Sequence, residues 1–445
     1  MRVQNRHRLA RVLAIVAGLA AFASGSARLV ADTRQVSVES LIYDLKSPDP
    51  VRRQFAARQL GVVRYRPAIP HLIPLAHDPV VAVRRDVEIS LEWMSDAQAL
   101  PGLIAFASDM ENDIRSRAVS AIVNVHLPQT NLVGTALTKI SEIITSEDED
   151  LEVIVEPDVP VDPIVVETLR ARLVDPQRGI RRTAIRGLGI LRAQPAVPDL
   201  LQVVREDRDD GLRFESVRAL RKIDDRSVAE QLVPLLNLNS DAVRNELIAT
   251  IGIMGYRGAV PELTRIVEQA ARTDKPRIVA FGALADIADP SSFALFDRLK
   301  ADDNEMMRLY ANEGIARTAD PSVKTAISGA RLVEKSARVR TAQAFALLRF
   351  GQGEYLDELI RDLERPATRN LAKEYLLETA PADRSALFMP RPVSSNARAQ
   401  LAEVLGRMRD PEARPVLEEL TRDPNSDVSR AAKLAVRRMN ATSSQ

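Results

Sequence analysis

Hydrophobic residues recur along this chain at a helical spacing, and that pattern itself repeats about every 31 residues. Twelve anchor positions mark the repeat: Arg53, Arg84, Arg115, Arg181, Arg213, Arg244, Arg277, Arg308, Arg340, Arg369, Arg398 and Ser429. The residue seven positions after each anchor is always aliphatic, as at Leu60, Leu188 and Val436. A fixed period of this length is typical of stacked supersecondary units and not of one globular core.

Each repeat predicts two helices joined by a short turn. In residues 180–191, Ile180, Ala184 and Leu188 fall on one stripe at helical spacing. The second helix, residues 196–204, also has an apolar face, and its proline stands in the first turn, where the missing N–H costs no hydrogen bond. Residues 38–440 therefore predict an all-α fold of about 24 helices, two in each repeat.

The turns contain a second regularity, an aspartate that stands six residues before the anchor arginine. Five repeats share it: Asp78 and Arg84, Asp109 and Arg115, Asp175 and Arg181, Asp207 and Arg213, and Asp302 and Arg308. An aspartate in this place caps the next helix or faces the arginine of a stacked neighbour. We therefore predict a structural turn ladder that sets the register between repeats. The alternative is solvated turn residues without such pairing.

These units resemble HEAT repeats, in particular the short bacterial type known as phycobilisome-lyase HEAT-like repeats. The resemblance rests on DPVVAVRRDVEISL from Asp78, DPQRGIRRTAIRGLGIL from Asp175 and SDAVRNELIATIGIMG from Ser240. It covers residues 38–440, and it is specific for fold but not for function. It implies a right-handed α-solenoid of about twelve HEAT-like helix pairs, with the second helices lining the concave side.

Two segments interrupt the repeat. Residues 146–163 contain eight acids, three prolines and no base, which predicts an inserted, exposed loop. Its candidate docking residues for a basic partner are Glu147, Asp148, Glu149, Asp150, Glu152, Glu156 and Asp158. The loop lacks the acid spacing and the glycine of a calcium-binding loop, so a solvated loop is favoured and partner docking is the alternative. Residues 380–396 predict a second irregular connection.

The N-terminal residues predict an export signal. Four arginines precede a twelve-residue apolar run, residues 12–23, and small residues follow it. The run is shorter than the roughly 20 residues that span a bilayer. We expect a signal peptide at residues 1–27, cleaved near Ala23–Ala31, a linker at 28–37, and a disordered tail at 441–445. The protein would then be periplasmic or secreted, in a bacterium.

Composition narrows the classes of function. The chain has no cysteine, which excludes disulfides, thiolate metal sites and a cysteine nucleophile. Aromatic residues make up 4% of the chain, too few for platforms that stack nucleic-acid bases. The formal charge of +1 falls to −3 once the four arginines of residues 1–27 are removed, which argues against nucleic-acid or anionic-lipid binding.

No catalytic, cofactor or metal constellation is apparent in the sequence. Among the four histidines, His71 and His77 stand six residues apart, a spacing that does not place two imidazoles on one helix face. His126 ends a predicted helix, where capping is the simplest role. The chain contains no His-Glu dipeptide, so the di-iron motif of deoxyhypusine hydroxylase, an enzyme built on similar repeats, has no counterpart here.

These observations predict an exported, non-catalytic protein-interaction scaffold that binds a protein or peptide partner along the concave face of the solenoid. We expect no cofactor, no metal, no nucleic-acid partner and no membrane span in the mature chain. The alternative is a HEAT-fold enzyme, either phycobilin-lyase-like or related to another lyase or hydroxylase.

Overall fold

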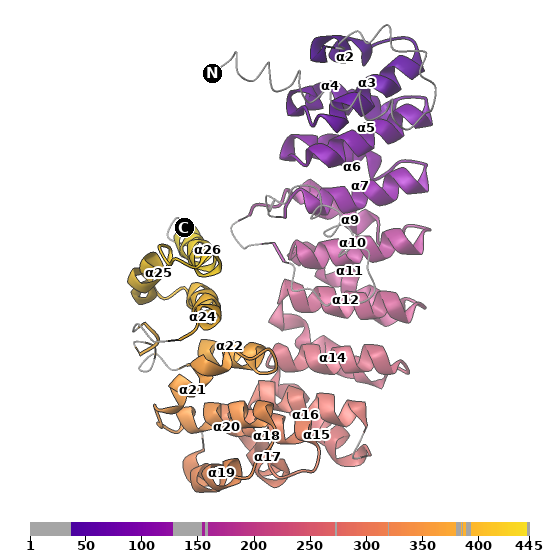
Figure 1. Ribbon diagram of the computed structural model, residues 1–445. Coiled ribbons are helices and arrows are strands. Elements are labelled where there is room, and N and C mark those ends of the chain that lie inside the picture. Colours follow the sequence, from indigo (N-terminus) through magenta and orange to yellow (C-terminus); the bar gives the residue numbers. More distant parts are fainter. Residues whose placement is uncertain are drawn as a thin grey trace, which may run out of the picture. The chain divides into compact units, whose positions relative to one another are not determined.

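The computed structural model describes residues 37–127, 154–155, 159–271, 274–318, 320–379, 384, 386–388 and 393–442. These residues form 23 α-helices and ten short 3-10 helices, and no strand occurs among them (Figure 1). The predicted all-α solenoid of helix pairs is therefore confirmed. Most second helices begin with a 3-10 turn, which leads the chain from one helix of the pair into the next.

The chain divides into two compact units, residues 1–223 and 224–445. In the N-terminal unit the first helices of successive repeats are α3 (Pro50–Val62), α5 (Val81–Met94), α7 (Asn112–Asn124), α10 (Arg178–Ile190) and α12 (Asp210–Ile223). The shorter helices that precede or separate them are α2 (Val38–Asp44), α4 (Ile69–Leu72), α6 (Leu100–Phe106), α9 (Pro163–Ala171) and α11 (Val197–Glu206).

The C-terminal unit continues the same alternation. Its first helices are α14 (Asp241–Ile253), α16 (Lys275–Ile287), α18 (Glu305–Thr318), α20 (Ala337–Arg349), α22 (Arg369–Leu377), α24 (Ser395–Met408) and α26 (Ser426–Thr442). Its second helices are α13 (Ala229–Leu232), α15 (Val260–Gln269), α17 (Phe293–Leu299), α19 (Lys324–Arg331), α21 (Tyr355–Asp362) and α25 (Arg414–Leu420).

The aliphatic residue seven positions after each anchor belongs to the core. Eleven of the twelve are fully buried: Leu60, Leu91, Ile122, Leu188, Leu220, Ile251, Leu284, Ile315, Leu347, Leu376 and Leu405. Val436 on α26, the last of the described first helices, is only partly buried. The period of the sequence thus marks the positions at which the hydrophobic effect holds neighbouring helices together.

Glycines let consecutive first helices approach closely. The glycine eight positions after one anchor faces a small residue six positions after the next, in the pairs Gly189–Ala219, Gly252–Ala283 and Gly406–Ala435. A Cβ on any of these glycines would lie within 2.7 Å of the facing alanine's Cα. A curved stack is most tightly spaced on its inner side. Within each unit the closely spaced helices are the first helices, which favours them for that side over the second helices that the resemblance implies.

The predicted acidic insert packs more than a wholly exposed loop would. Its last predicted residue, Pro163, is the first residue of α9, which Asp162 caps through the N–H of Ile164 at 3.0 Å. Val155 is buried, and its N–H donates to the carbonyl oxygen of Ile190 at 2.8 Å. Val155 is thus held against α10.

Two glycines of α10 provide a matched test of the close packing. Gly189→Ala should destabilise the N-terminal unit by about 1–3 kcal/mol, because the new methyl group overlaps the backbone of Ala219. Gly179→Ala meets nothing within 4 Å and should be stabilising by about 0.5–1 kcal/mol. Urea unfolding followed by the fluorescence of Trp93, the single tryptophan, measures both changes. Equal effects of the two substitutions would contradict this account.

Candidate functional site

The anchor arginines join the turns at the two ends of a repeat. In Arg84, Nη1 donates to the carbonyl oxygen of Asp78 at 3.1 Å, six residues earlier in the chain. Nε and Nη2 of the same arginine donate to the two carboxylate oxygens of Asp109, at 2.7 and 3.1 Å. Asp109 stands 25 residues after Arg84, in the turn that begins the next repeat. Each such bidentate pair forms one rung of the turn ladder.

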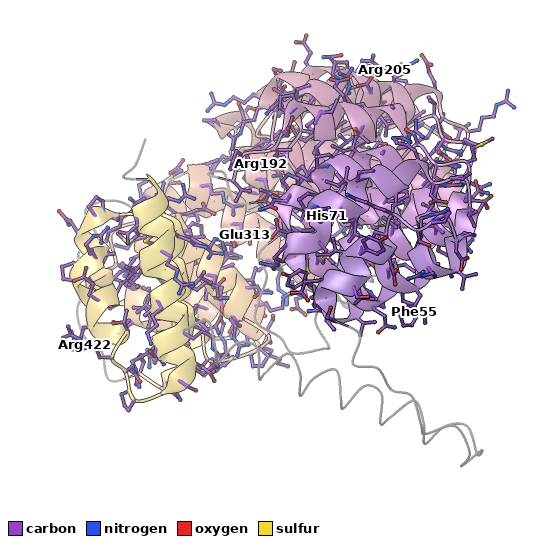
Figure 2. The ribbon with its side chains drawn as sticks, turned by 90° about the horizontal axis from the view of Figure 1, so that it is seen from above. Phe55, His71, Arg192, Arg205, Glu313 and Arg422 are labelled. Atoms are coloured by element: carbon purple, nitrogen blue, oxygen red, sulfur yellow. The ribbon has the colours of Figure 1, made fainter. Side chains whose placement is uncertain are left out.

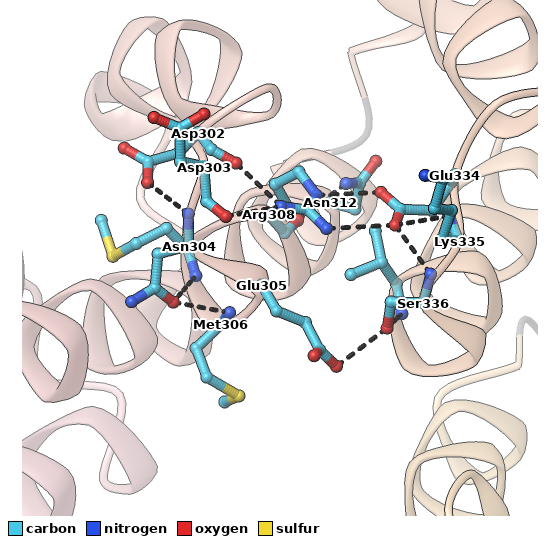
Figure 3. A network of polar contacts seen from close by, with 12 residues as sticks. Asp302, Asp303, Asn304, Glu305, Met306, Arg308, Asn312, Glu334, Lys335 and Ser336 are labelled. Carbon is cyan, nitrogen blue, oxygen red and sulfur yellow. Dashed lines mark hydrogen bonds and ion pairs between the residues drawn. The ribbon is translucent and has the colours of Figure 1, made fainter.

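Rungs recur in both units. The bidentate pairs are Arg53–Asp78, Arg84–Asp109, Arg115–Asp175, Arg308–Glu334 and Arg398–Asp423. The pair Arg277–Asp302 is looser, with 3.6 Å between Nη2 and Oδ2. Figure 3 shows Arg308 between the carbonyl oxygens of Asp302 and Asp303, at 2.9 and 3.0 Å, and the carboxylate of Glu334.

Four of the five six-residue pairs predicted from the sequence meet through the backbone of the aspartate. The carboxylate instead pairs with the arginine of the preceding repeat, as Asp78 does with Arg53. It also accepts a hydrogen bond from the N–H two residues later, at 2.9 Å from Val80. Of the two roles considered for these aspartates, pairing with a neighbouring repeat is thus found. Capping is not, because the N-cap of α5 is Val80 and no side chain caps that helix.

Two of the predicted arginines depart from this arrangement. Arg181 donates to the carbonyl oxygen of Asp175 at 2.8 Å, and Arg213 contacts the carboxylate of Asp210 at 3.4 Å. Neither forms a bidentate rung within the described part of the chain. Asp207 accepts the N–H of Asp209 at 2.8 Å, and the carboxylate of Asp209 accepts the N–H of Leu212 in α12.

The rung carboxylates remain charged. Burial alone would raise the pKa of Asp78, Asp109 and Asp175. Hydrogen bonds from an arginine and from a backbone N–H outweigh the burial and hold each pKa below its ordinary value. These geometries describe a structural device that positions successive repeats, and they leave no group free to react.

A second set of charged pairs lies on the face of the first helices, between two and nine residues after the anchors. The pairs are Arg117–Glu88, Arg186–Glu215, Arg317–Asp286, Arg317–Glu378, Lys373–Glu403 and Arg407–Glu374. Sequence reasoning missed them because acid and base come from different repeats. A sequence alignment of the repeats on their anchor residues would have placed these acids and bases at neighbouring positions.

The densest part of this face is a buried network in the C-terminal unit. The hydroxyl of Tyr375 donates to Oε1 of Glu313, although the two residues lie 62 apart in sequence. Arg317 forms a bidentate pair with Glu378 and reaches Oδ1 of Asp286 at 3.1 Å. Helix α22 is thus tied to α18 across the intervening α20. Solenoid repeats ordinarily contact only their nearest neighbours.

Burial governs the protonation of this network. It raises the pKa of Glu313 to about 7, although Arg317 and the Tyr375 hydroxyl oppose the shift. Burial likewise raises the pKa of Asp286. The ring of Tyr375 stacks on Phe345 of α20, with centroids 4.5 Å apart. The carboxyl of Glu313 is therefore enclosed by protein, a position suited to coupling repeats and not to contact with a substrate.

Exposed apolar side chains gather at the start of the N-terminal unit. We define the N-terminal patch as Phe55, Arg58 and Val62 of α3 with Trp93 of α5. The exposed fractions of Phe55, Val62 and Trp93 are 49%, 39% and 38%, and Phe55 lies at the surface in Figure 2. Spacings of three, four and seven residues put the α3 members on one stripe of the helix.

The patch is continuous across two repeats. Val62 and Trp93 occupy the same repeat position, nine residues after their anchors. Their helices pack directly together, since the Ser90 hydroxyl donates to the carbonyl oxygen of Ala57 at 2.8 Å. Residues at equivalent positions of stacked helices lie side by side, so Trp93 extends the stripe of α3 onto α5.

Other candidate sites give no constellation. Within the described residues, no group of three or more histidine or acidic side chains could hold a metal ion. His71 and His77 are exposed, and Nδ1 of His126 lies 2.9 Å from the carbonyl oxygen of Ile122. The seven acidic residues proposed for partner docking lie outside the described residues. No described helix has the length and apolarity needed to cross a membrane.

Comparison with known families matches more than half of the chain. A family model of HEAT repeats matches residues 38–123, 161–221 and 197–288. A model of the PBS lyase HEAT-like repeat matches residues 397–423. These segments include most of the turn ladder and first helices of both units, but not α18, α20, α22 or α26. No curated protein sequence matches the chain.

Solved structures of other proteins are similar at low sequence identity. An engineered protein is 17% identical, with a TM-score of 0.40 over 91% of this chain and 98% of its own. Importin beta is 12% identical, with a TM-score of 0.47 over 92% of this chain and 63% of its own. The complex of CpcE and CpcF of phycocyanin lyase from Nostoc is 18% identical, with a TM-score of 0.29 over 65% of this chain and 98% of its own. Likenesses of this size transfer no activity.

Proposed function

This chain belongs to the HEAT-repeat proteins, and we propose that it is an exported, non-catalytic scaffold that binds a protein partner along the face of its first helices. The observation that carries the proposal is the N-terminal patch. Its two aromatic residues, Phe55 and Trp93, are half-exposed on neighbouring helices in a chain that is only 4% aromatic. Exposed apolar surface on adjoining elements marks interaction sites in soluble proteins.

The chemistry of the patch supports a protein partner. Tryptophan, tyrosine and arginine dominate the binding energy of protein interfaces, because they bury a large area and keep polar groups for orientation. Trp93 and Arg58 supply two of these residue types on one surface. The rigid stack of α3 on α5 holds them in place before binding, which reduces the entropy lost when a partner docks.

Removing the aromatic side chains should weaken partner capture. The double variant Phe55→Ala, Trp93→Ala should weaken binding of a partner isolated from the host by about 2 kcal/mol or more, which is roughly thirtyfold. Affinity capture followed by titration of the purified partner measures the change. The control is Met110→Ala, which removes a 92% exposed apolar side chain from a turn. Equal capture by both variants would contradict the proposal.

The proposal that the protein is exported rests on the first 27 residues, which contain arginines, an apolar run and small residues in that order. N-terminal sequencing of the protein from its native host should find a chain that starts just after Ala23, Ala27 or Ala31. Recovery of an intact Met1 terminus from the cytosol would overturn this part of the proposal and leave the docking surface untouched.

A further inference from the structure

Several arginines on the first-helix face are neutralised by an acid of a neighbouring helix. Arg117 pairs with Glu88 at 3.1 Å, and Arg407 pairs with Glu374 at 2.9 Å. Arg186 pairs with Glu215 at the position equivalent to Arg58, five residues after the anchor. Acids of neighbouring helices thus neutralise these arginines.

Arg58 has no such counter-charge. It is exposed, and no acid of the described residues pairs with it. The nearest repeat-equivalent acid, Asp86, accepts a hydrogen bond from Nε2 of Gln54 at 2.8 Å instead. Arg58 lies three residues after Phe55 and four before Val62, so an unmatched guanidinium stands within the apolar stripe.

We propose that the N-terminal patch binds a protein segment in which a carboxylate lies beside an aliphatic or aromatic side chain. This inference rests on the proposed scaffold function and names the chemistry of its partner. The guanidinium of Arg58 presents paired N–H donors that match a carboxylate in a bidentate geometry. The ring faces of Phe55 and Trp93 and the methyl groups of Val62 cover the neighbouring apolar side chain.

Charge complementarity selects this occupant over others. Binding transfers Arg58 from water to a surface flanked by apolar groups, where an unpaired cation is unfavourable and a paired one contributes more than in bulk water. A segment that is only apolar would leave the guanidinium desolvated without a partner. A basic segment would add repulsion.

Peptide selection tests the inference. A random dodecapeptide phage library is panned on the immobilised full chain, on its Arg58→Glu variant and on Arg422→Glu, which reverses an exposed arginine of the C-terminal unit. The native chain and Arg422→Glu should enrich sequences with Asp or Glu beside Leu, Ile, Phe or Trp. Arg58→Glu should instead enrich Lys or Arg beside the same apolar residues. The best acidic peptide, titrated by Trp93 fluorescence, should bind Arg58→Glu about tenfold to hundredfold more weakly.

Several outcomes overturn the inference. They are enrichment of peptides without acids, identical enrichment on the native chain and Arg58→Glu, or no enrichment on any chain. A shift of Trp93 fluorescence on phosphatidylglycerol vesicles would assign the patch to a lipid surface, and a dimer abolished by Phe55→Ala would assign it to a second copy. A host partner captured equally by the native chain and Arg58→Glu, yet lost with Phe55→Ala, Trp93→Ala, would overturn this inference and leave the scaffold function standing.

Discussion

Arg115→Ala is expected to lower the free energy of unfolding of the N-terminal unit by about 3–5 kcal/mol. Arg115 is buried and donates to the two carboxylate oxygens of Asp175 at 2.7 and 3.2 Å. Its Nη1 also donates to the carbonyl oxygen of Asp109 at 2.6 Å. The substitution leaves the buried carboxylate of Asp175 without its bidentate partner, because Arg172 lies 3.9 Å away.

The matched control is Arg85→Ala, which breaks an ion pair with Asp113 on α7, the helix that also carries Arg115. That pair is 2.7 Å long, but its side chains are 40% and 51% exposed, so its loss should cost about 0–1 kcal/mol. Urea midpoints followed by Trp93 fluorescence report both variants. Similar losses would mean that the ladder residues are ordinary solvated turn residues, the alternative considered from the sequence.

In the native chain, the free energy of unfolding of the C-terminal unit should change with pH by about 2–3 kcal/mol because of Glu313, and Glu313→Gln should remove this change. Burial raises the pKa of Glu313 in the folded chain to about 7, from an ordinary value of 4.5. The folded state therefore binds this proton more tightly than the unfolded state. The resulting stabilisation is fully present below about pH 4.5 and is lost as the pH rises through about 7. Glutamine stays neutral and keeps an acceptor for the Tyr375 hydroxyl.

Calorimetry of the native chain and the variant at pH 5 and pH 8 measures this difference. The variant should gain stability relative to the native chain as the pH rises. Tyr375→Phe keeps the stack on Phe345 but removes a hydrogen bond that lowers the pKa of Glu313, so its pH dependence should move to higher pH. An unchanged pH dependence in Glu313→Gln would show that other groups carry the effect.

The helix pairs and their core were predictable because a period of about 31 residues encodes them directly. Leu60 and Leu188 each face the next repeat. They are therefore buried, and an aliphatic side chain suits that position. The ladder was predictable only in part. Spacing along the chain identified Asp78 and Arg84, but pairing across the stack joins Arg84 to Asp109, and Arg115 reaches Asp175 past the insert.

The buried network and the patch depend on how repeats are placed in space. Tyr375 meets Glu313 because the packing brings α22 to α18 across α20, and no local pattern in the sequence records that contact. The exposure of Trp93 follows from its place on the open face of α5, whereas a lone tryptophan in an apolar helix is ordinarily assigned to the core. The close spacing of the first helices could be identified only from the contacts between glycine and alanine in the structure.

Site-specific photocrosslinking in the native host tests the central claim most directly. A benzoylphenylalanine at position 55 places the reactive group on the N-terminal patch, and the same residue at position 110 serves as the control. The account predicts one discrete protein adduct from position 55 and none from position 110, with the adduct lost when Arg58→Glu, Trp93→Ala is added. Adducts of equal yield from both positions, or an adduct at position 55 that survives these substitutions, would contradict a scaffold that binds its partner through this face.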